Sequence, residues 1–362
     1  MQLAEILERS LSRPVAATRA SEAFLDSHRT KPRFAIGKNA EALAIHRLVP
    51  LDGIIDDYAA PGETWRNISL IRTVDAPKDA SVVNCSTSIR PVDTLDHLYA
   101  SGFRNVAGIP DLVRSAGGAL AWPDFVEAQR RELQVHIDAW QTIHDRLADD
   151  ASRQVLRDVL LFRLTADAEH MRGYTVRVME QYFEPFMEYG REVFVDAGGF
   201  DGDTSEAFAA RYPDYRKIFL FEPSAHNIAR ARERLAGLRD VAFFPIGLSR
   251  APGRLRFDPG AGSASAVSSF GSDEIVVDTL DAVVSEPVSF VKMDLEGWEL
   301  PALEGASGHI RSDRPKLAIA VYHGAADLRL IHEFVHSFDH DYRVFLRHYT
   351  QGWSETVLFF TR

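Results

Sequence analysis

A glycine-rich turn that directly follows an apolar run, at residues 193–204, constrains the fold of this chain more than any other stretch. The apolar residues 193–195 suit a buried parallel strand, which we expect to end at Asp196. Three glycines then let the backbone turn sharply and approach a ligand closely, before a helix predicted over residues 205–211. A strand, a glycine turn and a helix form the opening unit of a nucleotide-binding α/β sheet.

The residues of this turn favour one class of cofactor over another. The nicotinamide and flavin fingerprint requires Gly-x-Gly-x-x-Gly, so that a pyrophosphate can lie on the helix N-terminus. Here Gly198 and Gly202 are separated by three residues, and Phe200 stands where a second close-approach glycine would be needed. Asp201 and Asp203 also place negative charge where a pyrophosphate would lie. A cofactor that lacks phosphate and carries a cation fits better, and S-adenosylmethionine is such a molecule.

Glu222 follows a second predicted strand at residues 217–221. A carboxylate at this position can accept hydrogen bonds from both hydroxyls of a ribose. NAD would be served equally well, so Glu222 indicates a nucleoside without choosing between the two cofactors. The alternative is that Glu222 only favours the dipole of the helix that starts near Pro223 and Ser224. Ribose binding is favoured because the glycine turn lies at the expected distance upstream.

Several motifs occur in a fixed order in the second half of the chain. They read FVDAGGFDGDT at 194–204, FEPS at 221–224, VKMDLEGWE at 291–299, YH at 322–323 and LRHY at 346–349. Together they resemble the FkbM family of S-adenosylmethionine-dependent O-methyltransferases, from near residue 147 to the C-terminus. The resemblance implies S-adenosyl-L-methionine as cofactor and a hydroxyl of a sugar, glycan or secondary metabolite as acceptor. It also places Ile246 beside the adenine.

The predicted cofactor contacts combine the turn, the end of the second strand and the segment after the third. They are Asp196, Gly198, Phe200, Asp201, Thr204, Glu222, Pro223, Ile246 and Gly247.

Methyl transfer to a hydroxyl is an in-line displacement in which the acceptor loses its proton. Predicted strands at 289–293 and 317–321 bring Asp294, Glu296 and His323 to the cofactor edge of the sheet. An unperturbed pKa of about 6.5 would leave His323 largely neutral at pH 7 and able to accept that proton. We therefore predict His323 as the base, oriented by Asp294 or Glu296. The alternative is that His323 only forms a hydrogen bond across its loop.

The other candidate bases are Lys292 and, more weakly, Tyr322. Asp294, Glu296 and His323 could also bind a divalent metal ion. We predict no metal, because no third carboxylate has clear spacing, and we expect Glu299 to cap the next helix or to face solvent.

The order of apolar runs and turns predicts an α/β chain with two sheets. We expect an N-terminal helical segment at 1–30, a small Rossmann-like α/β domain at 31–110 and a helical connector at 111–190. A class I, doubly wound methyltransferase domain follows at 191–362, closed by an antiparallel strand pair at 342–346 and 355–360. Helices are predicted at 122–147, from 149 or 150 to 164, and at 174–183. Residues 263–269 would form a flexible linker or a lid over the cofactor.

The small domain weakly resembles the N-terminal domains of sugar-nucleotide-modifying acyltransferases. Gly37 follows its first strand, and Asp56 or Asp57 follows its second, so that a nucleotide or nucleotide-sugar could bind there. We favour a degenerate domain used for docking or dimerisation, because a single glycine in the turn is weak evidence for a nucleotide-binding site. Polar residues after a later strand, at 84 and 86–88, keep ligand binding open; they are Asn84, Ser86, Thr87 and Ser88.

Composition excludes some classes of partner. A net charge of −11 argues against nucleic acid, and a single cysteine, Cys85, permits neither an intramolecular disulfide nor a cysteine-based zinc site. No apolar run reaches membrane-span length, and the N-terminus lacks a secretory core. We expect a cytoplasmic enzyme, possibly a homo-oligomer, with a small-molecule or glycan substrate such as a nucleotide-sugar. The alternatives are a nicotinamide-dependent sugar-nucleotide oxidoreductase and a non-enzymatic two-domain adaptor with a vestigial cofactor site.

Overall fold

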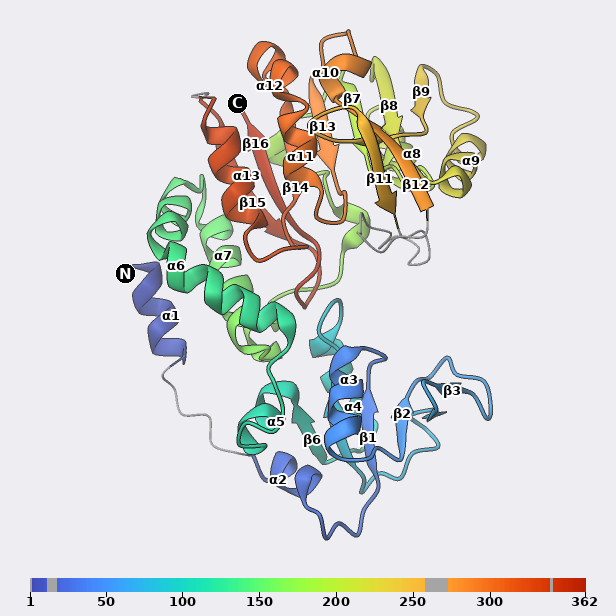
Figure 1. Cartoon of the computed structure of the whole chain (residues 1–362), viewed down its shortest axis with the longest axis vertical. Coiled ribbons are helices and arrows are strands. Elements are labelled where there is room, and N and C mark those ends of the chain that lie inside the picture. Colours follow the sequence, from blue (N-terminus) through green and yellow to red (C-terminus); the bar gives the residue numbers. More distant parts are fainter. Residues whose placement is uncertain (1, 12–17, 258–272, 339–340) are drawn as a thin grey trace. The chain divides into compact units, whose positions relative to one another are not determined.

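The computed structural model describes residues 2–11, 18–257, 273–338 and 341–362 (Figure 1). The chain forms two compact units, and each unit is assembled from three separate segments. Unit 1 consists of Met1–Gln141, Gln154–Arg177 and Tyr349–Ser354. Unit 2 consists of Thr142–Arg153, Val178–His348 and Glu355–Arg362.

Unit 1 is built around a six-stranded sheet with the order β3-β4-β2-β1-β5-β6. All neighbouring pairs are parallel except β3 with β4. The strands are β1 (Arg33–Ile36), β2 (Gly53–Ile55), β3 (Thr64–Trp65), β4 (Ile68–Ile71), β5 (Ser81–Asn84) and β6 (Asn105–Gly108). Val82 and Val83 are both fully buried but point to opposite faces, so this sheet is covered on both sides.

The helices of unit 1 begin at residues that suit helix starts. Asn39 caps α3 by accepting a hydrogen bond from the backbone N–H of Ala42 at 3.0 Å, and Pro91 begins α4. The helices are α1 (Leu3–Leu11), α2 (Arg19–Leu25), α3 (Ala40–Leu48), α4 (Pro91–Ala100), α5 (Ile109–Ser115) and the 3₁₀ turn η1 (Ala168–Met171). The long helices α6 (Asp124–Arg146) and α7 (Asp150–Thr165) each have residues in both units.

Unit 2 contains a seven-stranded sheet with the order β15-β16-β14-β13-β7-β8-β9. The pairs from β14 to β9 are parallel, whereas β16 runs antiparallel to both β14 and β15. The strands are β7 (Val193–Ala197), β8 (Lys217–Phe221), β9 (Val241–Phe244), β13 (Phe290–Met293), β14 (Lys316–Ala320), β15 (Arg343–His348) and β16 (Thr356–Thr361). The strand order reverses between β7 and β13, and ligands of such sheets bind at the carboxyl ends of the strands there.

Helices and a second small sheet complete unit 2. The helices are α8 (Asp203–Arg211), α9 (Ala225–Arg234), α10 (Leu280–Val283), α11 (Glu299–Glu304), α12 (Ser307–Asp313) and α13 (Asp327–His336), with 3₁₀ turns η2 (Val178–Glu180) and η3 (Pro185–Met187). The small sheet has the order β10-β12-β11, formed by β10 (Gly247–Leu248), β11 (Gly253–Phe257) and β12 (Asp273–Asp278). Phe194, Phe208 and Phe290 are fully buried between β7, β13 and α8.

The α/β class is confirmed, but several local predictions are wrong. The helix predicted at 174–183 is absent, and only the short turn η2 lies within that range. The helix after the glycine turn begins at Asp203, two residues earlier than predicted, with Gly202 as an N-cap that has no side chain to offer. Strands β3 and β4 were not predicted. The possible lid or linker at 263–269 lies outside the described residues.

Among the helices of the described residues, none combines the length and the apolar character that crossing a membrane requires.

Candidate functional site

The glycine turn after β7 is packed tightly between the ends of two other strands. Gly198 has φ +75°, and a Cβ there would lie 1.9 Å from the backbone oxygen of Asp294 at the end of β13. A Cβ on Gly199 would lie 2.4 Å from Cγ of Leu220 in β8. The backbone N–H groups of Gly198 and Gly199 both donate to the oxygen of Phe221 at 3.0 Å. Glycine is therefore required at both positions by conformation or by space.

A buried ion pair lies under this turn. Lys292 Nζ is 3.2 Å from Asp196 Oδ1, and both side chains are at least 96% buried. Lys292 also donates to the backbone oxygen of Gly198 at 2.8 Å, while Ser205 donates to Asp196 Oδ2 at 2.7 Å. Burial lowers the pKa of Lys292, but Asp196 and Asp294 outweigh that effect and raise it. This geometry gives Lys292 and Asp196 a structural role, and the catalytic role of Lys292 and the cofactor-binding role of Asp196 stay predictions.

Glu222 joins the end of β8 to the glycine turn. Its carboxylate accepts hydrogen bonds from the backbone N–H groups of Phe200 at 3.1 Å and Ser224 at 2.8 Å. The side chain of Asn227 donates to the same carboxylate at 3.4 Å. Glu222 is 6% exposed, and burial raises its pKa despite these bonds. The carboxylate thus sits at the strand end where a ribose would lie, and it also serves the start of α9.

Other predicted contacts surround the same turn. Asp201 lies in the turn, but its carboxylate pairs with Arg230 at 2.7 Å and Arg234 at 2.9 Å and is 5% exposed. Its charge is thereby balanced within the protein, so the acidic turn is less negative than the sequence suggests. Phe200 has φ 44°, and Thr204 lies in the first turn of α8.

Two predicted cofactor contacts lie in the segment after β9, the strand that pairs with β8. Ile246 is half-buried, and Gly247 is buried and begins β10, where a Cβ would lie 3.2 Å from Val277. Pro223 is half-buried and directly follows Glu222.

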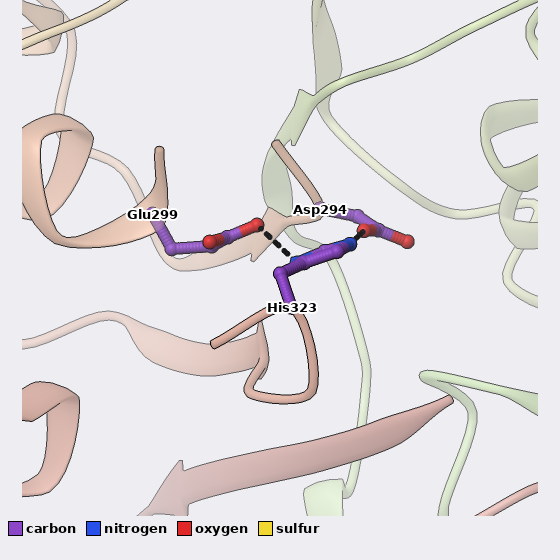
Figure 2. A group of neighbouring side chains, drawn as sticks. All are labelled: Asp294, Glu299 and His323. Carbon is purple, nitrogen blue, oxygen red and sulfur yellow. Dashed lines mark ion pairs between the residues drawn. The ribbon is translucent and has the colours of Figure 1, made fainter. Parts of the chain in front are cut away.

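The ends of β13 and β14 gather three carboxylates around one imidazole ring. His323 Nε2 lies 3.5 Å from Asp294 Oδ1 and 3.3 Å from Glu296 Oε2. His323 Nδ1 lies 3.1 Å from Glu299 Oε1. Figure 2 shows Asp294 and Glu299 approaching opposite edges of the ring. We call these four residues the His323 cluster.

The electrostatics of this cluster contradict one prediction. Burial would lower the pKa of His323, but its contacts with Glu296 and Glu299 and the charge of Asp294 outweigh burial and raise the pKa to about 11. The imidazole therefore carries a proton at neutral pH in this structure, and the expectation of a neutral ring with an unperturbed pKa is wrong.

Comparison with known proteins finds a family likeness in the C-terminal half of the chain. Residues 196–350 match the family model described as the methyltransferase FkbM domain. This part of the chain is similar to FkbM methyltransferase domains. The match includes the glycine turn, Glu222 and all of the His323 cluster, so the family resemblance of the sequence motifs is confirmed over these residues. No curated protein matches the chain.

One solved structure extends the likeness in fold beyond residues 196–350. Methyltransferase FkbM from Methylobacillus flagellatus KT has a TM-score of 0.75 and 23% identity, and the match covers 99% of this chain and 98% of that one. A putative methyltransferase from Streptococcus mutans in complex with SAH has 15% identity and a TM-score of 0.31, over 47% of this chain and 88% of that one. Aeropyrum pernix fibrillarin with bound S-adenosyl-L-methionine has 11% identity and a TM-score of 0.34, over 51% and 71%.

Three residues of unit 2 belong to the site although sequence reasoning predicted no role there for them. Glu299 is 1% exposed and faces His323, contrary to the expectation that it faces solvent. Tyr182 donates a hydrogen bond to Asp294 Oδ2 at 2.8 Å. Burial and the charge of Asp294 raise the pKa of Glu355 to about 7, against the opposing effect of contacts with Gln181 and Tyr322. A positive φ at Tyr182 (73°) and at Glu355 (64°) marks both positions, but it is visible only in the structure.

Unit 1 has a separate candidate pocket. It has a volume of about 250 Å³ and lies beyond the ends of β5 and β6, lined in part by Asn84, Ser86, Thr87, Asp111, Asp167 and Glu169. Ser88 is not among the lining residues; its backbone oxygen accepts a hydrogen bond from Ser354 at 2.8 Å.

Near Gly37, where the sequence left a nucleotide site open, Asp56 and Asp57 contact other residues of unit 1. Asp56 pairs with Lys38 at 2.5 Å, and Asp57 accepts hydrogen bonds from the backbone N–H and the hydroxyl of Thr73. A Cβ on Gly37 would lie 3.1 Å from the backbone of Cys85.

Proposed function

We propose that the chain is an S-adenosylmethionine-dependent O-methyltransferase. The observation that carries the proposal is the arrangement on the two sides of the switch point between β7 and β13. The glycine turn and Glu222 lie on the side of β7 and β8, where a nucleoside can bind. The His323 cluster lies on the side of β13 and β14, where an acceptor hydroxyl can meet the methyl group.

The proposed reaction uses the chain's own residues in two ways. Glu222 would accept hydrogen bonds from the ribose hydroxyls of the cofactor, and the glycine turn would allow a close approach of the cofactor to the backbone. The acceptor oxygen forms a bond to the methyl carbon while the sulfur–carbon bond breaks, which releases S-adenosylhomocysteine. The hydroxyl proton passes to a carboxylate of the His323 cluster. Assistance of this kind accelerates such reactions by about 10²–10⁴-fold.

The acceptor that we propose is a hydroxyl of a sugar, glycan or secondary metabolite, with nucleotide-sugars as the first compounds to screen. The many acids of the His323 cluster suit a neutral, hydroxylated acceptor better than an anionic group placed against them, because like charges repel. A phosphate of a nucleotide-sugar would then have to lie away from the cluster.

The experiment that tests the cofactor is a calorimetric titration of the purified full-length chain with S-adenosylhomocysteine, and separately with NAD. We expect micromolar binding of S-adenosylhomocysteine and no binding of NAD. Glu222→Gln should weaken binding by about 10–100-fold, because charge-assisted hydrogen bonds to the ribose are lost. Glu233→Gln, at an exposed position of α9, is the matched control.

Two results would redirect the proposal. Binding of NAD alone would favour a nicotinamide-dependent sugar-nucleotide oxidoreductase, which Glu222 also permits. If the folded chain bound neither compound, a two-domain adaptor with a vestigial cofactor site would become the better explanation.

A further inference from the structure

The His323 cluster concentrates negative charge in a largely buried place. Asp294, Glu296 and Glu299 all lie within 3.5 Å of the ring nitrogens of His323. Lys292 interacts with Asp294, but it already forms an ion pair with the buried Asp196. Three carboxylates against one imidazole leave an excess of negative charge, which is costly away from water unless a cation balances it.

The ring nitrogens of His323 lack hydrogen-bond partners of acceptable geometry. The side chain of His323 is 9% exposed, so it is more than nine-tenths buried. Neither ring nitrogen makes a hydrogen bond of acceptable geometry with any of the described residues, although both point at carboxylates. Buried polar atoms are nearly always hydrogen-bonded, and an exception indicates a partner such as a water or an ion.

We infer that, contrary to the expectation from the sequence, the His323 cluster binds one divalent metal ion, with His323 Nε2, Asp294 and Glu296 as its ligands. Two atoms bound to one ion at about 2.1 Å in neighbouring octahedral positions are about 3 Å apart. The separations of 3.5 and 3.3 Å between Nε2 and the two carboxylate oxygens are close to this value. Side-chain movements that bring the Asp294 and Glu296 oxygens toward each other beside Nε2 would place all three atoms on one ion.

Glu299 and two tyrosines hold these ligands in place. In metal sites, the second nitrogen of a ligating histidine commonly donates its N–H to a carboxylate. Glu299 Oε1 lies 3.1 Å from Nδ1 and is itself fixed by the backbone N–H of Leu295. Tyr182 and Tyr322 donate to Asp294 at 2.8 and 3.3 Å.

The spacing of donor atoms across the cluster supports the same location. Among the described residues, Asp294, Glu299 and His323 each offer a donor atom within 4.8 Å of the other two; Glu296 is not part of this group, so the Asp294 and Glu296 oxygens must approach each other for both to bind the ion. Because Asp294 and Glu299 approach opposite edges of the ring (Figure 2), one ion cannot take both ring nitrogens, and we assign Glu299 to the orienting position.

The ligand chemistry indicates the class of ion. Two carboxylates and one imidazole, without any thiolate, suit Mn²⁺ or Mg²⁺ completed by waters. The ion would hold the acceptor hydroxyl and make its proton more acidic. This use in catalysis rests on the proposed function, whereas binding of the ion does not.

The test is a titration of the full-length chain with MnCl₂ after removal of metals by a chelator. Free Mn²⁺ is measured by electron paramagnetic resonance, because bound Mn²⁺ loses its sharp signal. We expect one ion per chain. Asp294→Asn and His323→Gln should abolish binding, and Glu299→Gln should weaken it by about 10–100-fold, as changes behind a ligand commonly do. The exposed carboxylate variant Glu233→Gln should bind as the unchanged chain does.

Parallel measurements separate the possible failures. Wild-type protein that binds S-adenosylhomocysteine but no Mn²⁺ would overturn the metal site and leave the proposed function standing. Protein that binds Mn²⁺ at the cluster but no S-adenosylhomocysteine would support the metal site and overturn the proposed function. Unchanged Mn²⁺ affinity in Asp294→Asn would place the ion elsewhere and overturn the assignment. If that variant does not fold, Glu296→Gln serves instead, since Glu296 is 23% exposed, and unchanged affinity there would equally overturn it.

Discussion

At the scale of single residues, Gly198 is where the glycine turn meets the end of β13, which leads into the His323 cluster. Its φ is +75°, and a Cβ at this position would lie 1.9 Å from the backbone oxygen of Asp294, so there is no room for a side chain. We predict that Gly198→Ala lowers the free energy of unfolding by at least about 2 kcal/mol, from strain and steric overlap together. Binding of S-adenosylhomocysteine should be lost as well, because the end of β13 must move.

The control for this prediction is Gly237→Ala. A Cβ at Gly237 meets nothing within 4 Å, so we expect a change within about 0.5 kcal/mol. Urea denaturation and calorimetry of both variants provide the measurement. If Gly198→Ala were as stable as Gly237→Ala, the tight packing of the turn would be disproved.

Residue types predicted some site positions and not others, for a physical reason. The places of Gly198 and Glu222 at the ends of neighbouring strands could be predicted from sequence because the strand–turn–helix unit fixes them. The partners of His323 depend on tertiary packing, because Glu299 reaches the ring only through the conformation of the loop after β13. That loop contains Glu296 with φ 53°, which no sequence pattern predicts. The shifted pKa of His323 was missed for the same reason.

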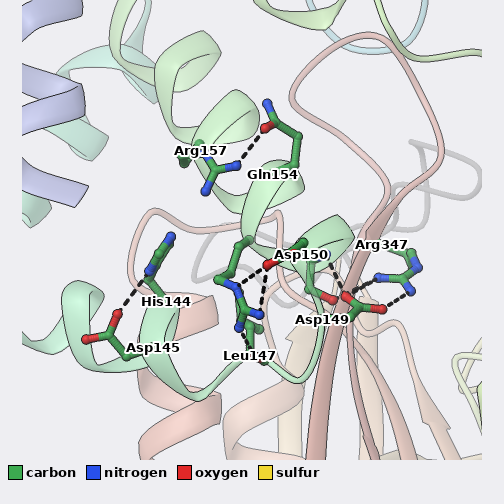
Figure 3. Close-up of polar contacts among 10 residues, drawn as sticks. His144, Asp145, Leu147, Asp149, Asp150, Gln154, Arg157 and Arg347 are labelled. Carbon is green, nitrogen blue, oxygen red and sulfur yellow. Dashed lines mark hydrogen bonds and ion pairs between the residues drawn. The ribbon is translucent and has the colours of Figure 1, made fainter. Parts of the chain in front are cut away.

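At the scale of elements, an ion pair joins the start of α7 to β15. Arg347 in β15 donates to Asp149 Oδ2 at 2.7 Å, and Asp149 accepts the backbone N–H of Ser152 at 2.7 Å (Figure 3). Burial disfavours the carboxylate, but hydrogen bonds from Arg347 and Ser152 outweigh burial and lower the pKa of Asp149 to about 2. A carboxyl group with a lowered pKa stabilises the fold above its unfolded pKa of about 4, and this contribution disappears as the pH falls toward 2.

We therefore predict that Asp149→Asn costs about 1–2 kcal/mol of unfolding free energy at pH 7. Because Asn can still cap the helix, the loss reports mainly the pairing with Arg347. The difference from wild type should shrink as the pH falls from 4 toward 2, as measured by urea denaturation at several pH values. Asp150→Asn, whose side chain is 98% exposed, is the neighbouring control. A difference that persists unchanged at pH 2 would contradict this explanation.

Elements with strong patterns were predicted well. The bounds of β8 agree with the strand predicted at residues 217–221, because an apolar run between polar residues leaves little choice of register. The helix predicted at 174–183 did not form, and its residues do not share one buried face: Val178 and Met179 are exposed, whereas Tyr182 is buried. Tyr182 illustrates this, since its hydroxyl points at Asp294 from a residue with φ 73°.

At the scale of the whole molecule, the connection between β15 and β16 belongs to a different unit from the two strands themselves. Tyr349–Ser354 is part of unit 1, whereas both strands belong to unit 2. Within unit 1, the backbone N–H groups of Gln351 and Trp353 donate to the oxygens of Ile89 and Thr87. Sequence order alone could not assign this connection, because nothing in a hairpin loop indicates that its contacts lie some 260 residues upstream.

Gln351 makes the most extensive of these contacts. It is 3% exposed, accepts the backbone N–H of Asp93 at 3.0 Å, and donates to Asp93 Oδ1 at 2.7 Å and to the oxygen of Tyr174 at 3.1 Å. Since Asp93 lies in the first turn of α4, the loop of the hairpin stabilises a helix of the N-terminal sheet. We predict that Gln351→Ala costs about 2–3 kcal/mol, because buried hydrogen bonds are lost and their partners are left unpaired.

The location of the effect distinguishes this explanation from a local one. Hydrogen exchange should accelerate in α4 and at residues 87–89, far from the substitution in sequence, while β15 and β16 keep their protection. Gln134→Ala, at an exposed position of α6, should change neither stability nor exchange. If Gln351→Ala instead loosened only β15 and β16, the loop would act as an ordinary hairpin turn. Its assignment to unit 1 would then have no energetic meaning.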